Sequence, residues 1–135
     1  MTHRLCAAFA AFLLVTPAFA EDPGYLFDAL RLKPYRIAWD KLMKDVQPTP
    51  DWLMQFNKNF DGLASQLVPI TIDGRPYELA YVCKPTDCGS RKFETLFEAG
   101  GARAYGALGG RDDAPAFYGD PAPALQAALA KAFKG

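Results

Sequence analysis

The chain has little histidine, little cysteine and no excess of charge. Its 135 residues include one His and three Cys, and 15 basic side chains balance 15 acidic ones. An even balance argues against a polybasic nucleic-acid surface and against an acidic disordered tail. Half of the residues are hydrophobic, which is too large a share for intrinsic disorder. A chain of this length predicts one domain.

The first twenty residues have the pattern of a secretory signal peptide. A basic start precedes an apolar run over residues 5–15, and Ala18 and Ala20 are the small residues expected before a cleavage site. The run is shorter than the ~20 apolar residues that a membrane-spanning helix needs. We therefore expect residues 1–20 to be a cleaved signal peptide and residues 21–135 to form a single exported domain.

Removal of that segment leaves a domain without histidine, because the one histidine is His3. Ser-His-Asp catalysis, Cys-His catalysis and histidine metal sites are then excluded. Two cysteines remain, Cys83 and Cys88, which are too few for a zinc site, so we expect no metal and no cofactor. In an oxidising compartment two such thiols pair by default.

Carboxylates are the remaining candidates for catalysis. Glu94, Glu98 and the adjacent Asp112 and Asp113 are available, but nothing in the sequence sets two of them across a cleft as a glycosidase requires. Asp112-Asp113 lies beside glycine and proline and is typical of a solvated turn. We predict that the protein is not an enzyme.

Hydrophobic spacing predicts helices in the first part of the domain. Residues 25–30 fit one short helical turn, and residues 34–46 carry apolar side chains every three or four positions. Asp51 is placed to cap a further short helix. The aromatic side chains here either form a platform for a sugar or partner or pack in the core, and we favour the core (Tyr35, Trp39, Trp52 and Phe56).

From Leu67 the pattern changes to the alternation of β-strands. Asp73-Gly74 is a strong signal for a two-residue hairpin turn between two such segments. Further strands are expected at residues 92–98, 103–108 and 116–118.

The chain ends in a predicted helix, for which Asp120 is the expected N-cap and Pro121 the first-turn residue. Helices are thus predicted before and after the strands, and they flank a central antiparallel β-sheet. This arrangement is an α+β fold.

A polar segment bounded by cysteines joins two of the predicted strands. A disulfide between Cys83 and Cys88 would close a small ring around Lys84-Pro85-Thr86-Asp87. The chain entropy that so small a ring removes is worth only about 2 kcal/mol, so the stronger effect of the bond is local rigidity. A rigid loop binds a partner at little ordering cost. The spacing alone leaves a binding loop and a simple hairpin staple equally favoured.

Three segments of the chain match a known pattern: Pro50-Asp51-Trp52-Leu53-Met54, the Asp73-Gly74 hairpin and, above all, Cys83-Lys84-Pro85-Thr86-Asp87-Cys88-Gly89-Ser90. In these segments the chain resembles the Ivy family, the periplasmic inhibitors of vertebrate (c-type) lysozyme. The resemblance covers most of the exported domain. It implies a central antiparallel β-sheet flanked by helices, a periplasmic location and the ability to form a homodimer.

The resemblance also implies a function. The disulfide-closed loop is expected to protrude and to plug the active-site cleft of a lysozyme-type muramidase, with Lys84, Pro85, Thr86 and Asp87 as the target-binding residues. The partners implied are a c-type lysozyme or the cell's own lytic transglycosylases. We expect no nucleic-acid binding and no membrane insertion.

One residue departs from the family pattern, which has histidine where this chain has Thr86. In the inhibiting members that histidine engages the catalytic carboxylates of lysozyme. Charged hydrogen bonds contribute ~1.5–3 kcal/mol against ~0.5–1.5 for neutral ones, so threonine predicts binding weaker by about an order of magnitude. Lys84 is a second candidate cation, and Asp87 suits an acidic partner only if it braces the loop internally. The alternative is a member that acts on lytic transglycosylases or another envelope partner.

Overall fold

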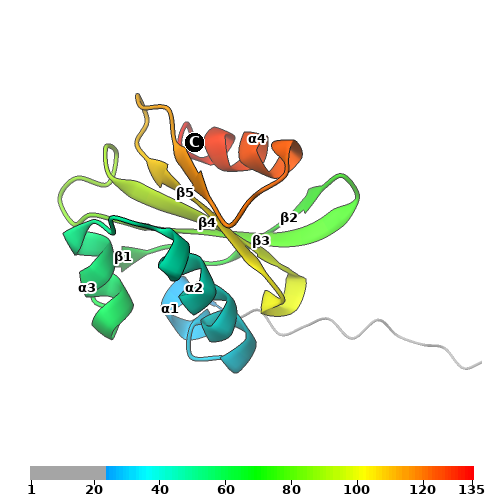
Figure 1. The fold of residues 1–135 in the computed structure, drawn as a ribbon, viewed down its shortest axis with the longest axis horizontal. Helices are drawn as coiled ribbons and strands as arrows, with labels where there is room; N and C mark the ends of the chain where they lie inside the picture. Colours follow the sequence, from blue (N-terminus) through cyan, green and yellow to red (C-terminus); the bar gives the residue numbers. More distant parts are fainter. Residues whose placement is uncertain (1–23) are drawn as a thin grey trace, which may run out of the picture.

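The helices of the chain lie on both faces of one antiparallel sheet (Figure 1). The computed structural model describes residues 24–135, so the expected signal peptide lies outside the described residues. The elements in chain order are α1 (Leu26–Ala29), α2 (Lys33–Asp45), α3 (Asp51–Asn59), β1 (Leu63–Ala64), β2 (Val68–Ile72), β3 (Arg75–Cys83), β4 (Lys92–Glu98), the 3₁₀ turn η1 (Ala99–Gly101), β5 (Ala104–Gly109), β6 (Ala116–Tyr118) and α4 (Pro123–Ala132). The predicted α+β class is confirmed.

The sheet has six strands in the order β1-β3-β4-β5-β6, and β2 also pairs with β3. The long strand β3 has two partners on one side because β2 pairs with its first half and β1 with its last two residues. The turn between β2 and β3 has positive φ at both central residues, 49° at Asp73 and 76° at Gly74. These values are those of a type I′ hairpin turn, as the Asp-Gly pair predicts.

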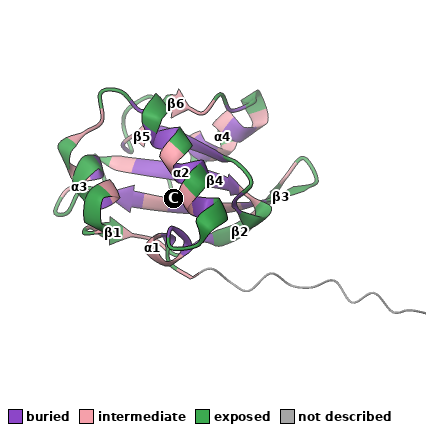
Figure 2. Cartoon of the chain, turned by 60° about the horizontal axis from the view of Figure 1, so that its bottom comes forward, coloured by how far each residue is buried: buried purple, intermediate pink, exposed green. Residues whose placement is uncertain are grey.

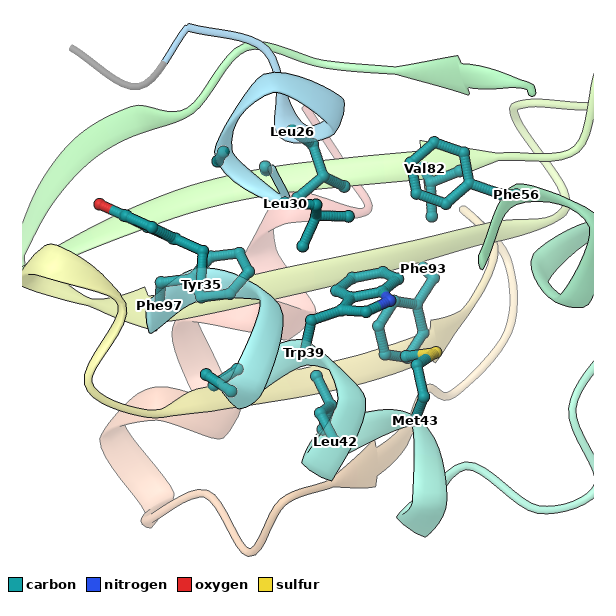
Figure 3. Close-up of a cluster of buried hydrophobic side chains, with 14 of the residues drawn as sticks. Leu26, Leu30, Tyr35, Trp39, Leu42, Met43, Phe56, Val82, Phe93 and Phe97 are labelled. Carbon is teal, nitrogen blue, oxygen red and sulfur yellow. The ribbon is translucent and has the colours of Figure 1, made fainter. Parts of the chain in front are cut away.

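One face of the sheet is covered by α1, α2 and α3, and it buries the larger aromatic side chains (Figure 3). The Trp39 ring of α2 lies edge-on to Phe93 of β4 and to Phe56 of α3, with centroids 5.9 and 6.1 Å away. Neither Trp39 nor Phe56 has exposed surface, and Tyr35 is nearly as buried. The preference for core packing is confirmed for these three, and Trp52 is half-buried but packs against the same cluster.

The opposite face is covered by α4. Its buried residues Leu125 and Leu129, followed by Phe133, form a second cluster with Leu96 of β4. Because helices cover both faces, the middle of the sheet is buried on both sides (Figure 2). The central strand β4 therefore buries Glu94 and Thr95 along with its apolar residues.

Two predicted helix starts were wrong. In α4 the N-cap is Ala122 and not Asp120, because Asp120 follows Gly119 in the left-handed region, with φ of 58°. An N-cap residue has extended backbone, which Ala122 adopts with φ −62° and ψ 159°. In α3 the N-cap is Pro50, and Asp51 is the first helical residue without a capping hydrogen bond.

Candidate functional site: the disulfide loop

The loop between β3 and β4, residues 84–91, lies at the end of the sheet next to α3 (Figure 1). Its base is closed by the backbone of Lys84, whose N–H donates to the carbonyl of Arg91 at 2.9 Å. The N–H of Asp87 donates back to the Lys84 carbonyl at 3.0 Å, which makes residues 84–87 a tight turn. The structure therefore brings all four sequence-predicted binding residues together in one turn.

Thr86 occupies the strained position of this turn. Its φ is 70°, in the left-handed region, as a type II turn requires at its third residue. Glycine and asparagine favour that region, and a β-branched residue there costs of order 1–3 kcal/mol. Pro85 holds the second position, where its fixed φ suits the turn. The segment is therefore held in one shape at an energetic cost to Thr86.

The disulfide between Cys83 and Cys88 closes the turn, with the two Cα atoms 4.9 Å apart. Cys83 has no exposed surface, whereas Cys88 is half-buried. The bond therefore ties the turn to the last residue of β3, in the packed part of the molecule. The predicted pairing is present, and the loop cannot open without breaking it.

Asp87 pairs within its own loop. Its carboxylate lies 3.5 Å from the Nε of Arg91, and its carbonyl accepts the N–H groups of Ser90 and Arg91 at 3.3 and 3.0 Å. Both side chains are well exposed, so the ion pair adds little stability. The pair places the positive charge of Arg91 beside the Asp87 carboxylate within the loop.

The exposed surface of the turn is formed by Lys84, Pro85 and Thr86. Lys84 has no ion pair within the described part of the chain, so its ammonium group is free to approach an anionic partner. The turn thus offers a cation and a hydroxyl on a preformed backbone. Among residues 24–135, no group of three or more His, Cys, Asp or Glu is arranged to hold a metal ion.

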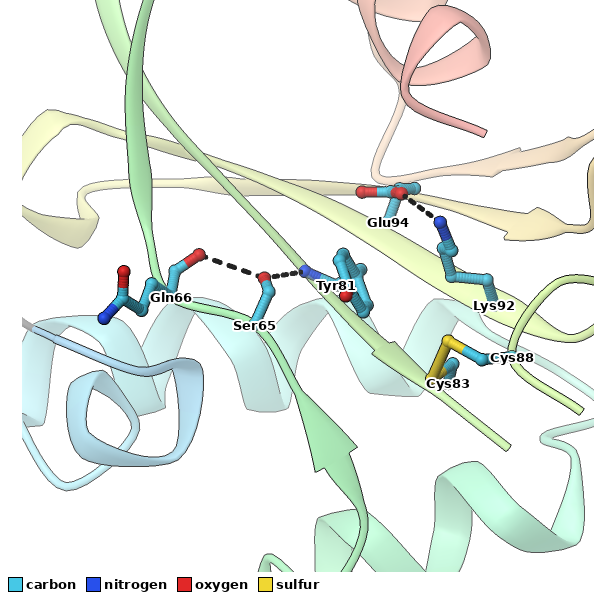
Figure 4. A network of polar contacts seen from close by, with 7 residues as sticks. All are labelled: Ser65, Gln66, Tyr81, Cys83, Cys88, Lys92 and Glu94. Carbon is cyan, nitrogen blue, oxygen red and sulfur yellow. Dashed lines mark hydrogen bonds and ion pairs between the residues drawn. A yellow bond between two sulfur atoms is a disulfide. The ribbon is translucent and has the colours of Figure 1, made fainter. Parts of the chain in front are cut away.

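A largely buried ion pair lies beside the disulfide, on the α4 face of the sheet (Figure 4). Lys92, which pairs with Cys83 across the ladder, places its Nζ 3.5 Å from Glu94 and 4.6 Å from the centre of the Tyr81 ring. Glu94 is only 2 % exposed. Burial raises the pKa of this carboxyl to about 7, and the nearby ammonium group of Lys92 offsets only part of that shift.

The sequence identifies Glu94 as a candidate carboxylate but does not predict its ion pair with Lys92 next to the disulfide loop. The only signal is that Lys92 and Glu94 are two residues apart on a strand, which places them on one face. Nothing in the sequence shows that α4 covers that face. Glu98, another candidate carboxylate, accepts a hydrogen bond from the Tyr105 hydroxyl at 3.0 Å.

The chain is similar to known proteins over most of its length. No family model matches the chain. A curated protein of Pseudomonas aeruginosa named "Inhibitor of vertebrate lysozyme" is 29% identical over 138 aligned residues, which cover 93% of this chain and 88% of that protein. The chain is therefore similar, over nearly its whole length, to an inhibitor of the family that its sequence resembles. An uncharacterised protein of the same organism is 30% identical over 108 residues, covering 78% of this chain and 66% of that protein.

This similarity supports the expectation of an inhibitor. The fold found here agrees with what the resemblance implied, a central antiparallel sheet with flanking helices and a Cys83–Cys88 loop. No helix within residues 24–135 is long and apolar enough to cross a membrane.

Proposed function

We propose that the protein is a periplasmic inhibitor of lysozyme-type muramidases and that its disulfide loop, residues 83–88, occludes the active-site cleft of the target. The observation that carries the proposal is the exposed Lys84–Thr86 turn, held rigid by a disulfide and by hydrogen bonds, in a chain similar to an inhibitor of vertebrate lysozyme. The periplasmic location rests on the secretory pattern of residues 1–20.

The chemistry of the turn suits an acidic cleft. Glycosidases of the lysozyme type use two carboxyl groups that flank the scissile bond. Lys84 brings an unpaired cation, the Thr86 hydroxyl can donate one hydrogen bond, and Asp87 is neutralised by Arg91. Because the turn is already ordered, little conformational entropy is lost on insertion.

Thr86 weakens this interaction relative to family members with histidine at that position. A hydroxyl carries no charge, so it cannot form the charge-assisted bonds of an imidazolium to carboxylates. We expect inhibition of a vertebrate lysozyme by the native chain to be about tenfold weaker than by the Thr86→His variant. Histidine, like asparagine, tolerates the left-handed backbone better than threonine, so the variant is expected to fold.

The test is a titration of lysozyme activity with native protein, Thr86→His and Thr86→Asn. Asparagine fits the same backbone without a charge and is the matched control. The proposal expects inhibition by the native chain, tighter inhibition by Thr86→His and no comparable gain for Thr86→Asn. Absence of inhibition by the native chain at a large excess, with the disulfide intact, would remove c-type lysozyme as its target.

The second candidate target is a lytic transglycosylase of the cell envelope. The neutral Thr86 favours it, since this residue removes the group that engages the carboxylates of lysozyme. If Thr86→His creates lysozyme inhibition where the native chain shows none, the native loop serves this other target. Inhibition of a purified lytic transglycosylase by the native chain would then be expected.

A further inference from the structure

A small cleft adjoins the disulfide loop. It is about 150 Å³ in volume and is lined by Pro50, Trp52, Ser90, Arg91, Leu108, Gly109 and Asp113. Trp52 belongs to the Pro50–Met54 segment that resembles the Ivy family, and it is the predicted core aromatic that the structure leaves half-buried. One side of the cleft, Ser90 and Arg91, is the returning limb of the loop itself. We call this feature the Trp52 cleft.

The Trp52 cleft and the disulfide loop are fixed to each other. The N–H of Arg111, in the turn between β5 and β6, donates to the carbonyl of Gly89 at 3.0 Å. A Cβ atom at Gly110 would lie 2.3 Å from the Ser90 carbonyl oxygen, so only glycine allows the two loops to pack this closely. The β5–β6 side of the cleft is therefore fixed to the disulfide loop.

The disulfide loop alone is too small for a stable interface. A specific protein–protein interface buries roughly 800 Å² on each partner and involves about 20–30 residues a side. The exposed turn supplies only Lys84, Pro85 and Thr86, with part of Asp87. A target held by this loop must therefore also contact the surface beside it, and the Trp52 cleft is the hollow part of that surface.

The composition of the cleft indicates what it takes. Its apolar part comes from Pro50, Trp52 and Leu108, and its polar rim comes from Ser90, Arg91 and Asp113. An apolar centre with a polar rim is the usual anatomy of an interface, and Trp and Arg are enriched among the residues that dominate binding. The volume is below the ~300–1,000 Å³ of small-molecule sites, which argues against an independent ligand.

We propose that the Trp52 cleft receives one apolar side chain from the rim of the target enzyme's substrate cleft while the disulfide loop enters that cleft. This inference rests on the proposed function and extends the contact surface beyond the loop. It makes Trp52 a determinant of which target is accepted, because the side chain on the target's rim must fit beside it.

The test fills the cleft without altering the turn. Ser90 is exposed at the cleft rim, so Ser90→Tyr places a ring in the cleft and leaves residues 84–87 unchanged. The matched control is Thr71→Tyr, on an exposed position of β2 near the Asp73-Gly74 hairpin. We expect Ser90→Tyr to weaken affinity for a vertebrate lysozyme at least tenfold, with unchanged melting temperature, and Thr71→Tyr to stay within twofold of the native chain.

A second pair of variants consists of Trp52→Ala, which removes an aromatic ring from the lining of the cleft, and a control on the same helix. Trp52→Ala is expected to lose at least tenfold in affinity, whereas Met54→Ala, which truncates an exposed side chain of the same helix, is expected to lose less than twofold. Melting curves show whether each variant is folded. If native protein binds lysozyme and both cleft variants bind equally well, this inference is overturned and the proposed function stands. If native protein does not bind lysozyme, the proposed function and this inference both fail for c-type lysozyme.

Discussion

The core beneath α2 and the disulfide loop are stabilised by different means. Around Trp39 the side chains are held by burial, with aromatic rings in contact and no exposed surface. In residues 84–87 the backbone is held by one turn hydrogen bond, one proline and one disulfide, while most of the side chains face solvent. The core therefore determines whether the protein folds, and under the proposed function the loop determines what the folded protein binds.

This division predicts that core substitutions cost the most stability. Trp39→Ala removes a fully buried ring that contacts Phe56 and Phe93 and leaves Asn57 without the indole N–H, which donates at 2.8 Å. We expect the free energy of unfolding to fall by about 3–5 kcal/mol. Urea denaturation followed by circular dichroism measures it. A loss below about 1 kcal/mol would show that the core does not depend on this ring.

Glu94 lies outside both regions, on the α4 face of β4, and its burial predicts a pH dependence. Because burial raises the pKa of Glu94 to about 7 in the folded state, the folded protein binds this proton more tightly than the unfolded chain. The resulting stabilisation is complete below the unfolded pKa, near 4.5, and is lost as the pH rises through about 7.

The Glu94→Gln variant is neutral at this position at every pH. Comparison with it therefore isolates the part of the pH-dependent stability that arises from ionisation of Glu94. We expect the variant to exceed the native chain in stability by roughly 3 kcal/mol well above pH 7 and to match it in acid. Urea unfolding at several pH values provides the comparison. The same slope of stability against pH in both proteins would contradict the assignment to Glu94.

Removal of the disulfide is expected to reduce binding of the target more than it reduces the stability of the fold. Cys88→Ala leaves Cys83 as a buried thiol and releases the turn. Stability is expected to fall by only about 2 kcal/mol, since the ring is small. Affinity for the target is expected to fall at least tenfold, because each residue that must be ordered on binding costs about 1–2 kcal/mol. Unchanged inhibition by the variant would mean that rigidity of the loop is not needed.

The smallest expected effect comes from the strained residue of the turn. Thr86→Gly removes the left-handed strain but increases the entropy of the unfolded chain. We expect a net gain in stability of about 1 kcal/mol together with weaker inhibition, since the hydroxyl is lost. Thermal melting and the lysozyme titration measure the two effects separately. A loss of stability would show that the turn does not strain Thr86.

The comparison also separates what the sequence predicted well from what it did not. The α2 helix and the Asp73-Gly74 turn were predicted because local spacing and turn chemistry determine them. The start of α4 was not, because Pro121 and Pro123 both suit a first helical turn and the left-handed φ of Asp120 decides between them. The two-residue strand β1 is too short to show a period.

Within the site, the turn residues were predictable and their surroundings were not. The cysteine spacing indicated residues 84–87, and the resemblance to the Ivy family pointed to their role. The burial of Glu94 depends on α4, which is distant in sequence, and the Trp52 cleft depends on three segments that only the tertiary fold brings together. Neither leaves a periodic signal along the chain.

The central claim is that the disulfide loop enters the substrate cleft of its target. Competition between the native protein and a chito-oligosaccharide for a vertebrate lysozyme tests it most directly, because both ligands would occupy the same cleft. The account predicts that saturating saccharide abolishes binding of the native protein and of Thr86→His alike. A complex that forms with undiminished affinity while the saccharide fills the cleft would contradict it.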